Sequence, residues 1–412
     1  MAVPLRSRLG ALQERDFRLL FTATTVTTVG DRLAGIALVF AVLEFGSATD
    51  LGLVLAARMS IEAVVLLGGG VISDRLPRHL VLVGASLTQG VAQAITAALV
   101  LTGSASVASL VALQALYGVG AGLVIPAEIG LVPQTVSSER LQQANALQGL
   151  SRNIVSVLGP ALGGVLVVAG TPGGALAVDA ASFIGCAVLL SRIRIAPRQG
   201  RAEKGGFFRE LREGWVEFVG RPWLWKSVVL IGISNFAWVG AWGVLGPVVA
   251  NEELGGAGAW ATILTAWGVG SVVGGVAAIR IRPRRPFFVS VLAPLPFALV
   301  LATLAVPAPL WVIAAAGFLA GAGISIHLTL WFTVFQREVP EHAQSRVSSY
   351  DAFGSFILNP LGFAVAGPLA AAIGVEETIA FAAAICLVTP LLVASLPSVR
   401  AIRAPAPVAS SA

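Results

Sequence analysis

The sequence has little of the charge that coats a soluble protein in water. Of its 412 residues only 12% are charged, whereas 56% are hydrophobic, and the mean hydropathy is +0.87. A soluble globule needs more polar surface than this composition provides. The chain is therefore predicted to lie in a membrane.

The sequence is also poor in the residues of metal and nucleophile chemistry. Cys186 and Cys386 are its two cysteines, and both fall in apolar runs, so we expect packing residues and no disulfide framework. No H-E-x-x-H or Cys/His ligand set, no G-x-x-x-x-G-K-[ST] and no nucleophile motif occurs. GVGAG at 118–122 lies in an apolar run and lacks the strand and acid of a dinucleotide fold. We therefore expect no enzyme activity, no catalytic residue, no metal and no cofactor.

Long apolar runs, in contrast, fill most of the chain. Each is long enough to cross the hydrocarbon core as a helix, and continuous runs of this length exclude the short alternating strands of a membrane β-barrel. The predicted fold is an all-α membrane protein with twelve transmembrane helices. The expected spans are 17–44, 50–72, 80–102, 105–133, 146–169, 173–192, 224–249, 257–279, 287–306, 309–334, 347–372 and 375–396.

The basic residues are concentrated in every second loop between these runs. If Met1 is cytoplasmic, all arginine-rich loops face the cytoplasm, whereas the outside loops contain no lysine or arginine. The net charge of +6 is thus explained by membrane topology and does not indicate nucleic-acid binding. We expect a multi-pass protein of the cell membrane with both termini in the cytoplasm.

The longest inside loop, residues 193–223, divides the chain into two groups of six spans. We expect a six-helix bundle at 1–192, a cytoplasmic linker at 193–223, and a second six-helix bundle with a short cytoplasmic tail at 224–412. The linker contains FFRELREGWVEF, which has the pattern of a helix on the membrane interface, although a plain surface linker remains an alternative. Glycine patterns recur in the two halves at an offset near 200, so the two bundles are expected to be pseudo-symmetric.

A short charged loop joins the second and third spans. The pattern G-x-x-x-D-R-x-P-R, from Gly70 to Arg78, resembles the loop signature of the major facilitator superfamily. The resemblance implies a cytoplasmic gate formed by Gly70, Asp74, Arg75 and Arg78, whose acidic residue docks on the opposite half in one state. A basic turn that only fixes topology is the alternative.

Most of the first half is similar to one branch of that superfamily, which contains enterobactin exporters and macrolide efflux proteins. The similar stretches are 14–38, 46–59, 126–166 and 175–183, joined by 331–349 in the second half. The resemblance implies an exporter. Two departures are Gln114, where many drug/proton antiporters have arginine, and the fifth-helix export motif, which lacks its first glycine. Its remaining residues, Gly159, Pro160, Gly163 and Gly164, still predict a close-packed hinge.

Four charged residues lie inside the first two spans. Asp31 and Arg32 are halfway along the first span, and Arg58 and Glu62 are four residues apart on one face of the second. Charges at this depth are costly and therefore candidates for function. One interpretation is a self-neutralising structural network, and the other makes Asp31 or Glu62 the proton acceptor of a coupled transporter, with Arg32 and Arg58 stabilising the charged form.

Weaker candidates for proton coupling are Glu128, Asp179, His327 and Asp351. For Asp179 a structural hydrogen bond is the favoured interpretation, and for His327 a packed histidine. A further set could line the substrate cavity as an apolar wall, with contact to lipid as the alternative. This set consists of Gln114, Trp238, Trp242, Trp267 and Trp331.

The resulting hypothesis is a secondary active transporter, a proton-coupled antiporter for efflux by alternating access. Its partners would be protons, the bilayer and an amphipathic small molecule such as a drug, antibiotic (macrolides included) or siderophore, with a monomer as the functional unit. One alternative is a lysophospholipid flippase or importer of the same fold. A membrane-embedded enzyme acting on a lipid-linked substrate is the alternative from a different class.

Overall fold

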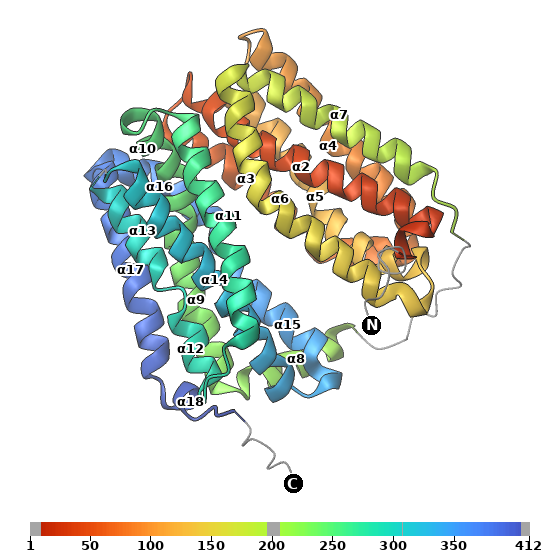
Figure 1. Ribbon diagram of the computed structural model, residues 1–412, viewed down its shortest axis with the longest axis vertical. Helices are drawn as coiled ribbons and strands as arrows, with labels where there is room; N and C mark the ends of the chain where they lie inside the picture. Colours follow the sequence, from red (N-terminus) through yellow and green to blue (C-terminus); the bar gives the residue numbers. More distant parts are fainter. Residues whose placement is uncertain (1–9, 196–206, 307, 405–412) are drawn as a thin grey trace, which may run out of the picture. The chain divides into compact units, whose positions relative to one another are not determined.

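The computed structural model describes residues 10–195, 207–306 and 308–404, and in these ranges the chain forms helices and no strand (Figure 1). Eleven segments of the described chain are long and apolar enough to cross a membrane. The helix Ala48–Arg75 occupies the place of the remaining expected span. The predicted twelve-helix fold is therefore confirmed, and the helix ends lie within a few residues of the predicted ends.

Contacts divide the chain into two compact units, which we call the first and second unit. The first unit comprises Met1–Ala202, Ala250–Thr265 and Phe363–Pro368, and the second comprises Glu203–Val249, Ala266–Gly362 and Leu369–Ala412. The linker segment expected to be helical is a helix over the described part, Phe207–Val219. The division of the bundles at 193–223 stays a prediction.

The first six spans are continuous helices joined by short turns. Ser47 and Ser106 begin two of them with capping boxes, in which the side chain of each serine accepts a hydrogen bond from the backbone N–H three residues later. Thr171 caps a third helix, ahead of Pro172 at its first position. The helices are α2 (Arg15–Leu43), α3 (Ala48–Arg75), α4 (Arg78–Leu101), α5 (Val107–Thr135), α6 (Leu141–Ala169) and α7 (Pro172–Ser191), with short 3₁₀ turns η1 (Gly10–Gln13) and η2 (Ser138–Arg140).

Glycines of α5 allow α3 and α5 to pack with their backbones in contact. A Cβ atom at Gly118 would lie 2.5 Å from the carbonyl oxygen of Arg58, and one at Gly122 would lie 2.7 Å from that of Glu62. Only glycine fits at such distances. This close approach places Arg58 beside the polar residues of α5. The helix pairs α4–α7, α4–α5, α2–α7 and α2–α6 complete the packing of this part.

Three of the later spans are interrupted. A π-helical segment, Ala241–Leu245, lies between α9 and α10; α12 and α13 are separated by a turn containing Pro294; and α15 and α16 are separated at 357–358, just before Asn359. The sequence prediction had treated each of these spans as one helix. The helices are α8 (Phe207–Val219), α9 (Pro222–Gly240), α10 (Gly246–Glu253), α11 (Ala257–Arg280), α12 (Pro286–Leu292), α13 (Pro296–Ala305), α14 (Leu310–Glu338), α15 (Glu341–Phe356), α16 (Asn359–Ile373), α17 (Val375–Ser395) and α18 (Pro397–Arg400).

Candidate functional site

An ionic cluster lies inside the first unit, where α2, α3 and α5 meet. Arg58 Nη2 donates to Asp31 Oδ1 at 3.2 Å, and the Tyr117 hydroxyl donates to the same oxygen at 2.6 Å. The guanidinium carbon of Arg58 lies 4.1 Å from the centroid of the Tyr117 ring. We call these three residues the Asp31 cluster. Arg58 thus neutralises Asp31 and gains a cation–π contact as well.

Glu62 does not join Arg58 in the pair that their helical spacing allowed. Arg58 contacts Asp31 and Tyr117, and no described cation lies within 4 Å of the Glu62 carboxylate. The physical reason is that α5 packs on the backbone of α3 at these two residues, and Tyr117 offers Arg58 its ring. The predicted network therefore consists of one ion pair with Glu62 beside it.

Arg32, the fourth member of the predicted network, forms no ion pair with the Asp31 cluster in the described chain. Its side chain is exposed, and no described anion pairs with it. Gly159 of α6 lies against its stem, since a Cβ atom at Gly159 would be 2.6 Å from Arg32 Cβ. Gly163 packs in the same way on Leu33, so these predicted hinge glycines form the contact between α6 and α2. The helix α6 continues through Pro160 and Gly164 without a break.

Asp179 of α7 is fully buried and has neutral partners. Gln93 Nε2 donates to its Oδ2 at 2.8 Å, and the Ser182 hydroxyl lies 3.3 Å from its Oδ1. A Cβ atom at Gly30 would collide with this carboxylate. Asp179 therefore links α4, α7 and the residue next to Asp31, as expected for a structural hydrogen bond.

A second ion pair in the first unit joins Glu128 of α5 and Arg152 of α6. Arg152 Nη1 is 3.6 Å from Glu128 Oε1, and Gln148 Nε2 donates to the same oxygen at 3.4 Å. Gln114, predicted to line the substrate cavity, is instead buried with 1% exposure, and neither atom of its amide has a partner in the described chain. In this structure Gln114 lies in the helix packing of α5, and its place in the substrate cavity stays a prediction.

The predicted gating loop is described in part. The side chain of Asp74 and the surroundings of Gly70 lie outside the described residues, although the backbone of both belongs to α3. Arg75 is exposed, and Arg78 Nη1 donates to the carbonyl oxygen of Gly130 in α5 at 2.6 Å. Arg78 is therefore held by its own unit in this structure.

Aromatic side chains replace charges in the interior of the second unit. The ring of Trp238 stacks on Trp242, Trp267 and Phe297, with centroids 4.9, 5.4 and 4.2 Å away. Trp242 lies in the π-helical segment, a feature common at functional sites. These four residues form an aromatic group that we call the Trp238 stack.

Trp331 has ring contacts other than those of the Trp238 stack, and its place in the substrate cavity stays a prediction. It is buried with 4% exposure, its ring contacts Phe287 and His327, and its Nε1 donates to Asp351 Oδ2 at 3.1 Å. Packing in the core decides its position. Asp351 also lies near the Ser355 hydroxyl, at 3.5 Å, so its partners are neutral.

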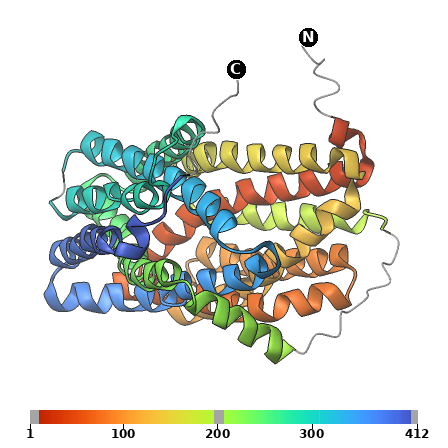
Figure 2. The ribbon, with the colours of Figure 1, turned by 90° about the horizontal axis from the view of Figure 1, so that it is seen from below.

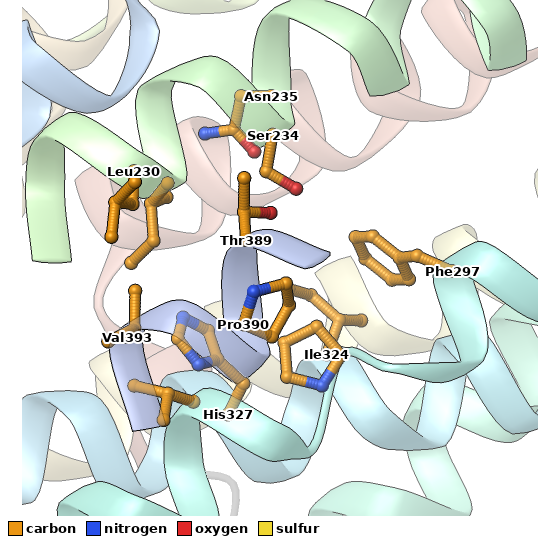
Figure 3. Close-up of a pocket in the computed structure, with 12 residues that line it drawn as sticks. Leu230, Ser234, Asn235, Phe297, Ile324, His327, Thr389, Pro390 and Val393 are labelled. Atoms are coloured by element: carbon orange, nitrogen blue, oxygen red, sulfur yellow. The ribbon is translucent and has the colours of Figure 1, made fainter. Parts of the chain in front are cut away.

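A pocket with neutral polar groups lies in the second unit (Figure 3). Ser234 and Asn235 of α9 and Thr389 of α17 supply hydroxyl and amide groups, whereas Phe297, Ile324 and Val393 supply apolar surface. His327 also reaches the lining, but its Nδ1 is 2.8 Å from the carbonyl oxygen of Ser290, as expected for a packed histidine.

Sequence reasoning did not identify Tyr117, Gln93 and Asn235. Tyr117 is one of only two tyrosines and lies inside an apolar span, which was a usable signal. Gln93 and Asn235 had no such signal, because neutral amides are frequent in this chain and their importance depends on a partner in another helix.

Residues 20–362 match the family model of the Major Facilitator Superfamily. Since this range covers most of the chain, the protein belongs to that superfamily and is a multi-pass membrane transporter. It is 26% identical over 371 residues to the enterobactin exporter EntS of Escherichia coli O1:K1 / APEC, a match that covers 86% of this chain and 87% of EntS. It is 34% identical to the uncharacterized MFS-type transporter y4rN of Sinorhizobium fredii over 152 residues, covering 35% of this chain and 37% of that protein.

Solved structures share the fold at low sequence identity. A mutant of the nucleoside transporter NupG has a TM-score of 0.71 at 9% identity, with 91% of this chain and 98% of that chain covered. A bacterial homologue of the iron transporter ferroportin in an inward-facing state has a TM-score of 0.69 at 16% identity, with 93% and 99% covered. These likenesses establish the fold and leave the substrate open.

Proposed function

We propose that the protein is a proton-coupled exporter that moves an amphipathic small molecule, such as a drug, antibiotic or siderophore, out of the cell by alternating access. Membership of the superfamily and the similarity to an enterobactin exporter support export. The functional unit is a monomer in the cell membrane, with both termini in the cytoplasm.

The observation that carries the coupling proposal is the arrangement of charge in the first unit. Arg58 lies four residues from Glu62 but contacts Asp31 and Tyr117. A carboxylate inside a membrane span needs a cation, water or a proton to neutralise it. Because no described cation is within 4 Å of Glu62, we assign the transported proton to Glu62 and a supporting role to the Asp31–Arg58 pair.

In the proposed cycle, protonation removes the negative charge of Glu62. Arg58 of the Asp31 cluster lies on the same helix, α3, so a change at Glu62 alters the field around the Asp31–Arg58 pair. A coupled exporter requires two access states that differ in proton affinity. We expect the Asp31–Arg58 ion pair to be stronger in one of these states than in the other. The gating loop with Gly70, Asp74, Arg75 and Arg78 is the proposed cytoplasmic gate, and Gly159, Pro160, Gly163 and Gly164 the proposed hinge.

The test is proton flux in proteoliposomes with a substrate found by a susceptibility screen of a pump-deficient host. Glu62→Gln should abolish substrate-dependent proton flux while substrate exchange without a proton gradient continues. Glu252→Gln, at an exposed position of α10, is the matched control and should transport normally. If Glu62→Gln retains coupled flux and Asp31→Asn loses it, the proton role belongs to Asp31.

A lysophospholipid flippase is the second candidate, because an apolar groove lies between α2 and α6. Lipid movement that is independent of pH and needs no soluble substrate would favour it. Covalent product without net movement would instead identify a membrane-embedded enzyme.

A further inference from the structure

The groove between α2 and α6 is a feature to which the coupling proposal assigns no role. The two helices run side by side in the first unit (Figures 1 and 2). Phe21, Thr25 and Val29 line the groove from α2, and leucine and isoleucine side chains, among them Ile154 and Leu158, line it from α6. It contains about 730 Å³ of space outside protein atoms, including its open side. We call it the α2–α6 groove.

The two walls of the groove differ in chemistry. Ile154 and Leu158 are 48% and 52% exposed, so the α6 wall presents apolar surface to an occupant. On α2, the residues at 18, 22, 25, 29 and 32 follow helical spacing and share one face. This face carries two arginines and two threonines, and a helix face against lipid is apolar. This face extends beyond the groove lining of Phe21, Thr25 and Val29, and it is suited to water and a polar ligand group.

Hydroxyl groups connect the walls near the middle of the groove. Thr25 Oγ1 and Ser151 Oγ are 2.8 Å apart. Either hydroxyl can accept a second hydrogen bond or donate one to a ligand. The groove thus contains a polar point between the two apolar surfaces.

Arg32 supplies a positive charge at the end of this polar face, and in the described chain no ion pair holds it. Its neighbour Asp31 is occupied by Arg58 and Tyr117, and no described anion lies within 4 Å of Arg32. Gly159, which lines the groove, lies against the stem of Arg32, so any larger residue there would displace it. A cation held inside a membrane span is stabilised by an anion or by water. Because Arg32 is exposed, the anionic group of a ligand can reach it.

We propose that the α2–α6 groove binds an anionic amphiphile, with Arg32 on its carboxylate or sulfonate group and the α6 wall covering its apolar body. The occupant is a freely diffusing molecule rather than a bilayer lipid, because the exposed α2 face that borders the groove carries hydroxyls and charge, whereas a helix face against lipid is apolar. The inference deepens the proposed export function by naming the charge of the substrate, and it rests on that function for the direction of movement.

The experiment measures equilibrium binding of three fluorescent probes to the full-length protein in phosphatidylcholine nanodiscs, with empty nanodiscs as background. The probes are pyrenebutanoate, pyrenebutanol and pyrenebutyl-trimethylammonium, which share one apolar body and differ in head charge. The wild type should bind the anionic probe most tightly. Arg32→Gln should weaken binding of the anionic probe by about tenfold or more, as expected for the loss of a charge-assisted hydrogen bond. The affinity for the neutral probe should stay unchanged.

Two further variants guard against a general defect. Arg32→Lys keeps the charge and should bind the anionic probe within a few-fold of the wild type. Arg282→Gln, an exposed arginine of the second unit, is the matched control and should change nothing. Leu158→Ser should weaken binding of all three probes, because the apolar α6 wall contacts the pyrene body that they share.

Equal binding of the anionic probe by the wild type and Arg32→Gln would overturn the proposal. So would loss of anionic-probe binding in nanodiscs that contain phosphatidylglycerol, since the groove would then hold a lipid headgroup. Binding needs no transport, so a protein that binds as expected but exports nothing contradicts the proposed function and leaves this inference intact.

Discussion

The two units of this transporter place polar chemistry inside the membrane in different ways. The first unit uses continuous helices and charged side chains, as in the Asp31 cluster and the Glu128–Arg152 pair. The second unit has interrupted helices, stacked aromatic rings and neutral hydrogen-bonding groups around the pocket of Figure 3. An ion pair needs two side chains held at a defined distance, which straight packed helices provide. An interrupted helix frees backbone N–H and C=O groups that can form hydrogen bonds with a ligand.

Proline alone does not explain the interrupted helices. Helix α5 contains Pro126 and Pro133, and α6 contains Pro160, yet both helices are continuous. The break between α12 and α13 coincides with Pro294 and Pro296, two prolines in a three-residue stretch. One missing N–H is tolerated inside a helix when neighbours satisfy the freed carbonyl, whereas two removed donors in the same turn end it.

The largest effect is expected from separating the ion pair of the first unit. Arg58→Gln leaves Asp31 without its cation, and a broken buried pair costs about 3–5 kcal/mol. Because the Asp31 side chain is 42% exposed, we expect about 2 kcal/mol. This loss of stability is measured as a decrease in the apparent melting temperature in nanodiscs. The double variant Asp31→Asn/Arg58→Gln should be more stable than Arg58→Gln alone, and a double variant that is no better would contradict a direct pair.

Close helix contacts at glycine occur in both units, so replacing the glycine should lower stability in each unit alike. In this respect the two units do not differ. Gly118→Ala would place a Cβ atom 2.5 Å from the Arg58 carbonyl oxygen, and Gly321→Ala would collide with the Trp267 carbonyl oxygen. Each substitution should destabilise its unit by about 1–2 kcal/mol, within the range that overpacking gives. Gly149→Ala, where no atom lies within 4 Å, is the control. An unchanged melting temperature for Gly118→Ala or Gly321→Ala would contradict the prediction. It would show that the two helices in contact at that glycine can move apart at no cost.

Two tryptophans of the second unit should differ in what they support. Trp331→Phe removes the hydrogen bond to Asp351 in a buried site and should lower stability by about 1–2 kcal/mol. Trp238→Phe keeps an aromatic ring in a partly buried stack and should change stability by less than about 1 kcal/mol. Substrate affinity is the second measurement, and it should fall for Trp238→Phe by a few-fold. The reverse order of the two effects would place Trp331 in the substrate site.

The smallest effect is expected from Asp351→Asn in the second unit. Asp351→Asn keeps an oxygen to accept from Trp331 Nε1 and has no described cation to lose. Stability and coupled flux should both remain within experimental error of the wild type. Asp31→Asn is the comparison, because the same substitution there removes the charge paired with Arg58. Equal losses in both variants would show that Asp351 carries charge-dependent function.

Much of the fold followed from hydropathy, because the bilayer imposes one length on every span. The expected span 173–192 and the helix Pro172–Ser191 differ by one residue at each end. The family was also accessible, since the loop from Gly70 to Arg78 and the stretches of the first half carry its pattern. Composition and local pattern are enough for these conclusions.

The contacts between side chains of different helices could not be predicted from the sequence in the same way. Helical spacing permitted Arg58 to pair with Glu62, but the packing of α5 on α3 and the position of Tyr117 direct it to Asp31. Its position inside a span grouped Trp331 with the other tryptophans, whereas packing puts it beside Phe287 and Asp351. A span's length is a property of one segment and its solvent, but an ion pair, a stack or a groove depends on which helix faces which, and that is settled by three-dimensional packing.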